Sequence, residues 1–115
     1  MEDYIIREID RIGEILMLVA KRLGLFLDDV PDYSLVDVKE EFLKNGCPID
    51  IDDLLQQETP VRYLVEQKKL SDQGLETMID ILFHSDLDDA KKEVLLNDAL
   101  AHLNGKGYFS FKLNR

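Results

Sequence analysis

The apolar positions at the start of the chain predict one long amphipathic helix. They are separated alternately by four and three residues, the spacing that keeps one seam of a helix against a neighbour; the seam consists of Ile5, Ile9, Ile12, Leu16, Val19, Leu23 and Phe26. Ile15, Met17 and Leu18 point away from this seam and widen the apolar surface. We therefore expect residues 1–27 to form a core helix covered on several sides, by its own fold or by a second copy.

Residues 28–58 carry the start and stop signals of two short helices. Gly24 is expected to close the first helix, and Ser34 and Asp50 are expected to cap the next two at their N-termini. Asn45 and Gly46 end the earlier of these two. Their apolar stripes are Leu35, Val38 and Phe42 with Leu43 beside them, and Ile51, Leu54 and Leu55.

Residues 59–106 are predicted to be helical and to end in a helical hairpin. Thr59-Pro60 starts one helix, Ser71 caps a second that runs to His84, and Ser85-Asp86 opens the last long helix. Gly105 and Gly107 follow its end. The faces expected to be buried are Val61, Leu64, Val65 and Leu70; then Leu75, Met78, Ile79 and Leu82; then Leu87, Ala90, Val94, Ala99 and Leu103.

Residues 107–115 alternate apolar and polar side chains, which is typical of one extended strand with Phe109, Phe111 and Leu113 on one side. We expect Phe109 and Phe111 to be buried, because exposing both would leave an adhesive apolar edge. The fold class is thus all-α: an orthogonal or up-down bundle of about five to six helices around a long N-terminal helix, with a short extended C-terminal tail. Residues 1–115 are expected to form a single helical domain.

The opening residues Asp3 to Ile9 read Asp-Tyr-Ile-Ile-Arg-Glu-Ile and lead into the long apolar helix. This start resembles that of a family of small bacterial helical proteins, defined as a domain of unknown function, over about the first 25 residues. The resemblance implies a helical bundle in a bacterial cytoplasm. It implies no catalytic or ligand-binding residue.

The negative charge of the chain is concentrated in one region. The formal net charge is −10, and residues 28–58 hold ten acidic and two basic side chains. Such a surface repels phosphate backbones and anionic lipids, so we expect neither nucleic acid nor a membrane as a partner. The uncharged run between Glu14 and Lys21 is also far shorter than a bilayer requires.

The residues that could carry chemistry have simpler structural interpretations. The acidic groups Asp28-Asp29-Asp32, Asp50-Asp52-Asp53 and Asp86-Asp88-Asp89 lack the glycine of a calcium-binding loop, and helix capping explains the last two. His84 and His102 lie near helix ends, where they would cap or face water. Cys47 is expected to be a half-buried inert thiol, and a lone cysteine with no secretory signal indicates the cytoplasm. We expect no catalytic, cofactor-binding or metal-binding residue, and no enzyme activity.

Two functions remain open. The first is a protein-interaction or structural module that forms a homodimer through Ile15, Leu18, Phe109 and Phe111, and offers the acidic face of residues 28–58 to a basic protein. The alternative is a small-ligand or enzymatic pocket lined by acidic residues and tyrosines, namely Tyr4, Tyr33, Tyr63 and Tyr108. Because buried tyrosines usually belong to the core, we favour the interaction module. A nucleic-acid mimic is a weaker third interpretation.

Overall fold

A computed structural model describes residues 11–110 and Leu113, and within them the chain is all-helical. The helices are α2 (Arg11–Arg22), α3 (Leu35–Lys44), α4 (Ile51–Gln56), α5 (Pro60–Glu66), α6 (Asp72–Phe83) and α7 (Asp89–Gly105). The predicted all-α fold is confirmed. The first ten residues, including Tyr4 and the opening Asp3 to Ile9 that resembles a known family, lie outside the described residues.

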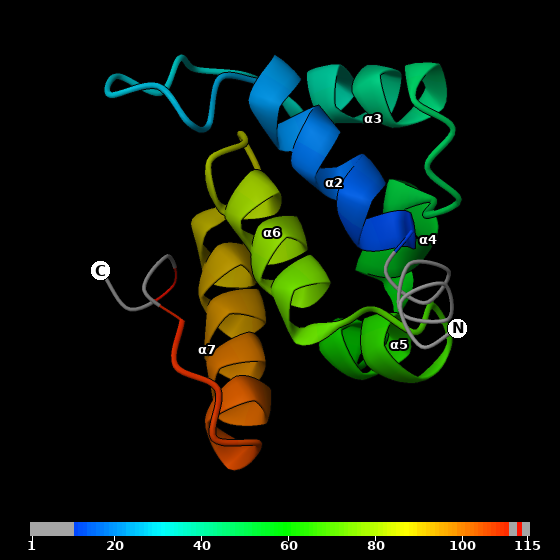
Figure 1. The fold of residues 1–115 in the computed structure, drawn as a ribbon, viewed down its shortest axis with the longest axis vertical. Coiled ribbons are helices and arrows are strands. Elements are labelled where there is room, and N and C mark those ends of the chain that lie inside the picture. Colours follow the sequence, from blue (N-terminus) through cyan, green and yellow to red (C-terminus); the bar gives the residue numbers. More distant parts are fainter. Residues whose placement is uncertain (1–10, 111–112, 114–115) are drawn as a thin grey trace, which may run out of the picture.

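Helix α6 is the centre of the described fold. Every residue from 74 to 82 is buried, and α6 packs against α2 and α7, which lie on either side of it in Figure 1. The sequence pattern predicted one buried stripe on this helix, but Thr77 and Ile81 are also buried, since neighbours cover it all round. Helices α6 and α7 are consecutive, lie side by side and are joined by a short connector.

Helix α2 presents one face to the core and ends where the sequence predicted. Leu16 and Val19 are fully buried. Gly24 adopts φ +87°, its amide bonds to the Lys21 carbonyl, and the Leu25 amide bonds to the Ala20 carbonyl, an arrangement that satisfies the last carbonyls of the helix. The turn redirects the chain, so the expectation that Phe26 continues the buried seam was wrong; its side chain is 51% exposed.

The N-terminal caps of α3 and α4 are formed as predicted. The Ser34 hydroxyl accepts from the Asp37 amide, and the Asp37 carboxylate accepts from the Ser34 amide, which completes a capping box. The Asp50 carboxylate accepts from the amides of Asp52 and Asp53. Val38 and Phe42 are buried, whereas Leu43 is 84% exposed because it lies off the face that meets the core.

The start of α7 differs from the prediction. Its N-cap is Asp88, which accepts from the Lys91 amide, whereas Ser85 and Asp86 belong to the connector before it. The Ser85 hydroxyl donates to the Leu82 carbonyl and accepts from the Leu87 amide. Ser85 therefore completes the α6 end of the hairpin, and the last helix begins only at Asp89.

The buried face of α7 consists of Leu95, Ala99 and Leu103, spaced by four residues. The expectation that Ala90 and Val94 lie on this face was wrong, since Ala90 is exposed and Val94 is 55% exposed. Apolar residues occur on most sides of this helix, so packing against α6 and α5, and not periodicity, selects the side that is buried.

The described part of the C-terminal tail is not a strand. Phe109, predicted to be buried, is 59% exposed, whereas Ser110 and Leu113 are buried. The Leu113 amide donates to the Ser110 hydroxyl at 3.1 Å, and an exposed Phe109 beside buried Ser110 is the reverse of the alternation predicted for an extended strand. Phe111, also predicted to be buried, lies outside the described residues.

Candidate functional site

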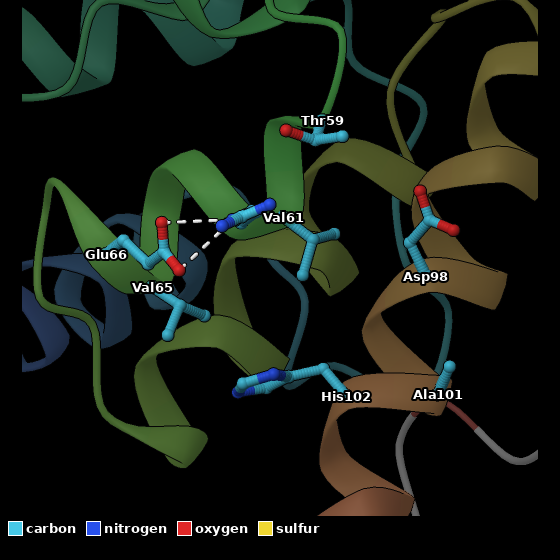
Figure 2. A pocket seen from close by; sticks show the side chains of 8 residues that line it. Thr59, Val61, Val65, Glu66, Asp98, Ala101 and His102 are labelled. Carbon is cyan, nitrogen blue, oxygen red and sulfur yellow. Dashed lines mark hydrogen bonds and ion pairs between the residues drawn. The ribbon is translucent and has the colours of Figure 1, made fainter.

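A cleft of about 410 Å³ separates α5 from α7. Pro60 begins α5 at a position where a missing amide costs nothing, and the helix then directs Val61 and Val65 toward α7 (Figure 2). From α7, the ring of His102 extends toward these valines, and Asp98 lies one turn before it. The residues lining this α5–α7 cleft are Thr59, Val61, Arg62, Val65, Glu66, Asp98, Ala101 and His102.

The charged groups of the α5–α7 cleft are partly paired. The Arg62 Nε lies 3.1 Å from both carboxylate oxygens of Glu66, one turn later on the same helix. Both side chains are largely exposed, so this pair contributes little to stability. It does pair the arginine with a carboxylate, so among the described acidic and basic residues of this cleft other than histidine, Asp98 is the charge outside the pair.

A second cleft, of about 250 Å³, continues along α7 toward its N-terminus. Its α7 wall includes Val94 and Leu95, and its opposite wall comes from the end of α4, the connector and Pro60. The full lining is Leu55, Gln57, Glu58, Pro60, Ala90, Lys91, Val94 and Leu95. Neither cleft was predictable from the sequence, because each forms between segments that are 30 or more residues apart in the chain.

A third cleft, of about 340 Å³, lies at α3 and the start of α4 and includes Cys47. Burial raises the pKa of the Cys47 thiol, which the Ile49 backbone and Lys68 only partly offset. The thiol is therefore protonated at neutral pH and a poor nucleophile, and its half-buried position confirms the sequence prediction. Two of the residues that line this cleft, Lys39 and Asp52, form an ion pair at 2.7 Å.

The described tyrosines have three different environments. The Tyr33 hydroxyl is buried and donates to the Ile81 carbonyl at 2.6 Å; burial, and then the charge of Asp80, raise the pKa of Tyr33. The Tyr63 hydroxyl donates to the Asp53 carboxylate at 2.9 Å. Burial, with Glu76 and Asp72 nearby, raises the pKa of Tyr108. None of the three lines the clefts above, and Tyr4 lies outside the described residues.

The buried carboxylates of α6, Glu76 and Asp80, were not predicted from the sequence. Glu76 and Asp80 are 7% and 5% exposed. Asp80 lies one helical turn before His84, whose Nδ1 is 3.3 Å from the Asp80 carboxylate and 3.0 Å from its carbonyl. His84 is thus the C-cap residue of α6, as a histidine near a helix end was expected to be. The i, i+4 spacing of Asp80 and His84 was the signal available in the sequence.

The three acidic groups have different positions in the fold. Asp50 and Asp88 cap α4 and α7, and Asp86 accepts from the Leu35 amide at the start of α3. Asp28, Asp29 and Asp32 lie exposed between α2 and α3. Within the part of the chain that the structure describes, no three histidine, cysteine or acidic side chains are placed to hold a metal ion.

The candidate interface residues do not form one surface. Leu18 is 47% exposed on α2, Ile15 on the same helix is half-buried, and Phe109 is 59% exposed beyond α7. Figure 1 shows α2 and the segment after α7 well apart. Phe111 lies outside the described residues, so Leu18 and Phe109 are the exposed apolar residues of two separate candidate surfaces.

No known protein family, curated protein or solved structure matches this chain. In residues 11–110, none of the helices is both long and apolar enough to cross a bilayer. The fold and its clefts therefore define the class: a protein that is all-helical in its described residues and centred on α6, with exposed acidic side chains in residues 28–58 and clefts beside α7 and α3. The family resemblance at Asp3 to Ile9 stays a prediction.

Proposed function

We propose that this protein is an interaction module that self-associates and offers an acidic face to a basic protein partner. One observation carries the proposal. Eight large apolar side chains of the described residues are exposed, and five lie between residues 18 and 43: Leu18, Phe26, Leu27, Val36 and Leu43. They come from α2, from α3 and from the segment between these two helices, and exposed large apolar residues on neighbouring elements favour contacts with other proteins.

The same part of the chain supplies the negative charge. Nine of the ten acidic side chains in residues 28–58 are exposed, the exception being half-buried Glu41. Glu41 pairs with Arg22, and Lys39 pairs with Asp52, so little positive charge is left to balance the others. Apolar residues interspersed with carboxylates favour a basic partner, since complementary charge accelerates association and excludes other partners.

The observations support the alternative pocket less well. A ligand pocket built from tyrosines and acids needs those groups to converge, and the partners of Tyr33, Tyr63 and Tyr108 lie in different places. We place the protein in the cytoplasm as part of the proposal, because its single Cys47 leaves no cysteine for an internal disulfide.

Solution mass measured across a concentration series tests self-association. The chain has a mass of 13.3 kDa, and the weight-average mass should rise toward twice that value with concentration. Leu18→Glu should remain monomeric, whereas Lys21→Gln, an exposed position on the same helix with the same change in net charge, should still dimerise. A wild-type mass of one chain at every concentration would overturn the dimer.

The acidic face is tested separately with a flexible lysine-rich peptide. Asp28→Asn with Asp29→Asn should weaken its binding several-fold, because two exposed carboxylates of the face are removed. Asp89→Asn with Glu93→Gln, exposed on α7, removes the same charge elsewhere. Equal weakening by both pairs would mean attraction to net charge alone and would contradict a specific acidic face.

A further inference from the structure

The two clefts beside α7 are lined by neighbouring residues of the same elements. Pro60 lines the smaller cleft and Val61 lines the larger one. On the α7 side, Val94 and Asp98 are one turn apart and line the smaller and the larger cleft respectively. We call the two clefts together the α7 groove. Its α7 residues extend from Ala90 to His102, about 18 Å at a rise of about 1.5 Å per residue.

The α7 wall of the groove has the spacing of a helix-packing seam. Its residues are Ala90, Lys91, Val94, Leu95, Asp98, Ala101 and His102, which are related by steps of three and four residues. Residues at this spacing lie on one flank of a helix, where a second helix laid alongside would meet them. Only Leu95 of this set is buried against the core, so the flank is open to a partner.

The chemistry of the groove is an apolar floor with a predominantly acidic rim. Val65 and Val94 supply apolar surface, and the Val94 side chain is 55% exposed; Val61 also lines the groove but is only 5% exposed. The carboxylates are Glu58, Glu66 and Asp98, and the bases are Lys91 and Arg62. Arg62 pairs with Glu66, so among the described Asp, Glu, Lys and Arg residues of the lining, the charges outside this pair are negative at Glu58 and Asp98 and positive at Lys91.

We propose that the α7 groove binds an amphipathic helix of about three turns from a basic partner protein, its apolar side chains on the valines and a lysine or arginine beside Asp98. A helix fits better than an added strand, because strand addition needs an open sheet edge and the described residues form none. This site goes beyond the dimer and the acidic face of residues 28–58, and does not depend on either.

The test uses labelled helical peptides and the full chain. One peptide has leucines at the spacing i, i+3, i+4, i+7 and lysines elsewhere; a second replaces every lysine with glutamate. Fluorescence anisotropy should show binding of the lysine peptide and at least tenfold weaker binding of the glutamate peptide. Equal binding of both, or binding of neither, would overturn the proposal.

Matched variants separate the groove from general charge attraction. Asp98→Lys and Glu93→Lys change the net charge equally and both lie exposed on α7, but Glu93 faces away from the groove. Asp98→Lys should raise the Kd for the lysine peptide at least tenfold, and Glu93→Lys less than twofold. Ala101→Trp, which fills the groove at an exposed position, should also weaken binding. Equal effects of the two lysine variants would overturn the proposal.

A second copy of the chain is the rival occupant. In that case Asp98→Lys or Ala101→Trp would shift the solution mass of the protein toward one chain, and the lysine peptide would compete with dimer formation. That result would overturn the helix-docking site, but it would leave the proposed self-association standing. Loss of the dimer in Leu18→Glu with unchanged peptide binding would instead support both proposals as separate surfaces.

Discussion

Two features of position 24 favour glycine at the end of α2, namely its backbone φ angle and the lack of space for a side chain. Its φ of +87° strains any residue with a side chain, and an added Cβ would lie 2.8 Å from the Cδ of Pro31. Gly46 has a similar φ of +68°, but a Cβ there would meet no atom within 4 Å. The two glycines therefore separate backbone strain from steric overlap.

We expect Gly24→Ala to lower the free energy of unfolding by about 3 kcal/mol, and Gly46→Ala by about 1 kcal/mol, because only the former adds steric overlap to backbone strain. Urea denaturation at constant pH measures both values. Equal losses in the two variants would show that the contact with Pro31 relaxes without cost.

Protonation of Tyr33 makes the free energy of unfolding depend on pH above about pH 10. Its hydroxyl donates to the Ile81 carbonyl in the last turn of α6, where carbonyls lack helical partners. Because burial and Asp80 raise the pKa of Tyr33, the folded protein retains this proton above about pH 10, where the unfolded chain loses it. The contribution of Tyr33 to stability is therefore complete below about pH 10 and falls as the pH rises, by about 1.4 kcal/mol per unit.

Tyr33→Phe should lower the free energy of unfolding by about 1 to 2 kcal/mol at about pH 8, through loss of the buried hydrogen bond. The difference in the free energy of unfolding between the two proteins should narrow between about pH 10 and 11, because only the wild type has Tyr33, whose contribution falls in this range. Denaturant titrations at each pH check this, and Tyr63 and Tyr108 titrate alike in both proteins. A constant difference across this range would refute the linkage.

At the scale of elements, the start of α3 is stabilised by Asp86, which lies 51 positions after Leu35 in the chain. The Leu35 amide, in the first turn of α3, donates to the Asp86 carboxylate at 2.8 Å, in addition to the local capping box of Ser34 and Asp37. Asp86 thus ties the α6–α7 connector to α3. Free amides at a helix start are destabilising when left without an acceptor.

Asp86→Ala should lower the free energy of unfolding by about 1 kcal/mol, the typical value for a lost N-terminal cap. Asp32→Ala, an exposed position in the connector before α3 with the same charge change, should change it by less than about 0.5 kcal/mol. Thermal or urea unfolding measures the two. A loss at Asp32 as large as that at Asp86 would point to net charge and not to the cap.

Helix ends were predictable from the sequence because their causes are local. Ser34, Asp50 and Ser71 cap the helices assigned to them, and Gly24 and Gly46 close the helices before them. Asp86 shows the limit of such signals. It has the residue type and spacing of a cap for α7, yet its partner is Leu35, 51 positions away, and sequence proximity cannot indicate that contact.

The orientation of α7 and the site beside it were not predictable from periodicity. Ala90 precedes Val94 by about one helical turn, and Leu95 and Leu96 follow Val94 directly. Apolar residues therefore occur on several faces of α7. Which of them is buried depends on where α5 and α6 pack. The α7 groove lies between α7 and the segment formed by α4, α5 and their connector, and how these pack is a property of the whole fold and not of a single segment.

At the scale of the whole molecule, the net charge of −10 acts in opposite directions on the two kinds of contact proposed. Two copies of the chain repel one another, so charge opposes a dimer formed by apolar residues such as Leu18. The same charge attracts a basic helix to the α7 groove, where Glu58 and Asp98 lie. Salt screens both effects, with a Debye length of about 10 Å at 0.1 M falling to about 3 Å at 1 M.

Raising the salt concentration from about 50 mM to about 500 mM should therefore strengthen dimerisation and weaken binding of the lysine peptide, each by several-fold. Sedimentation equilibrium measures the first and fluorescence anisotropy the second, on the same protein samples. Leu18→Glu should abolish the salt-dependent change in mass and keep the salt-dependent change in peptide binding, because the two surfaces are separate. If salt weakened the dimer as well, charge pairs and not apolar contacts would hold the two copies together, and the role given to Leu18 would be wrong.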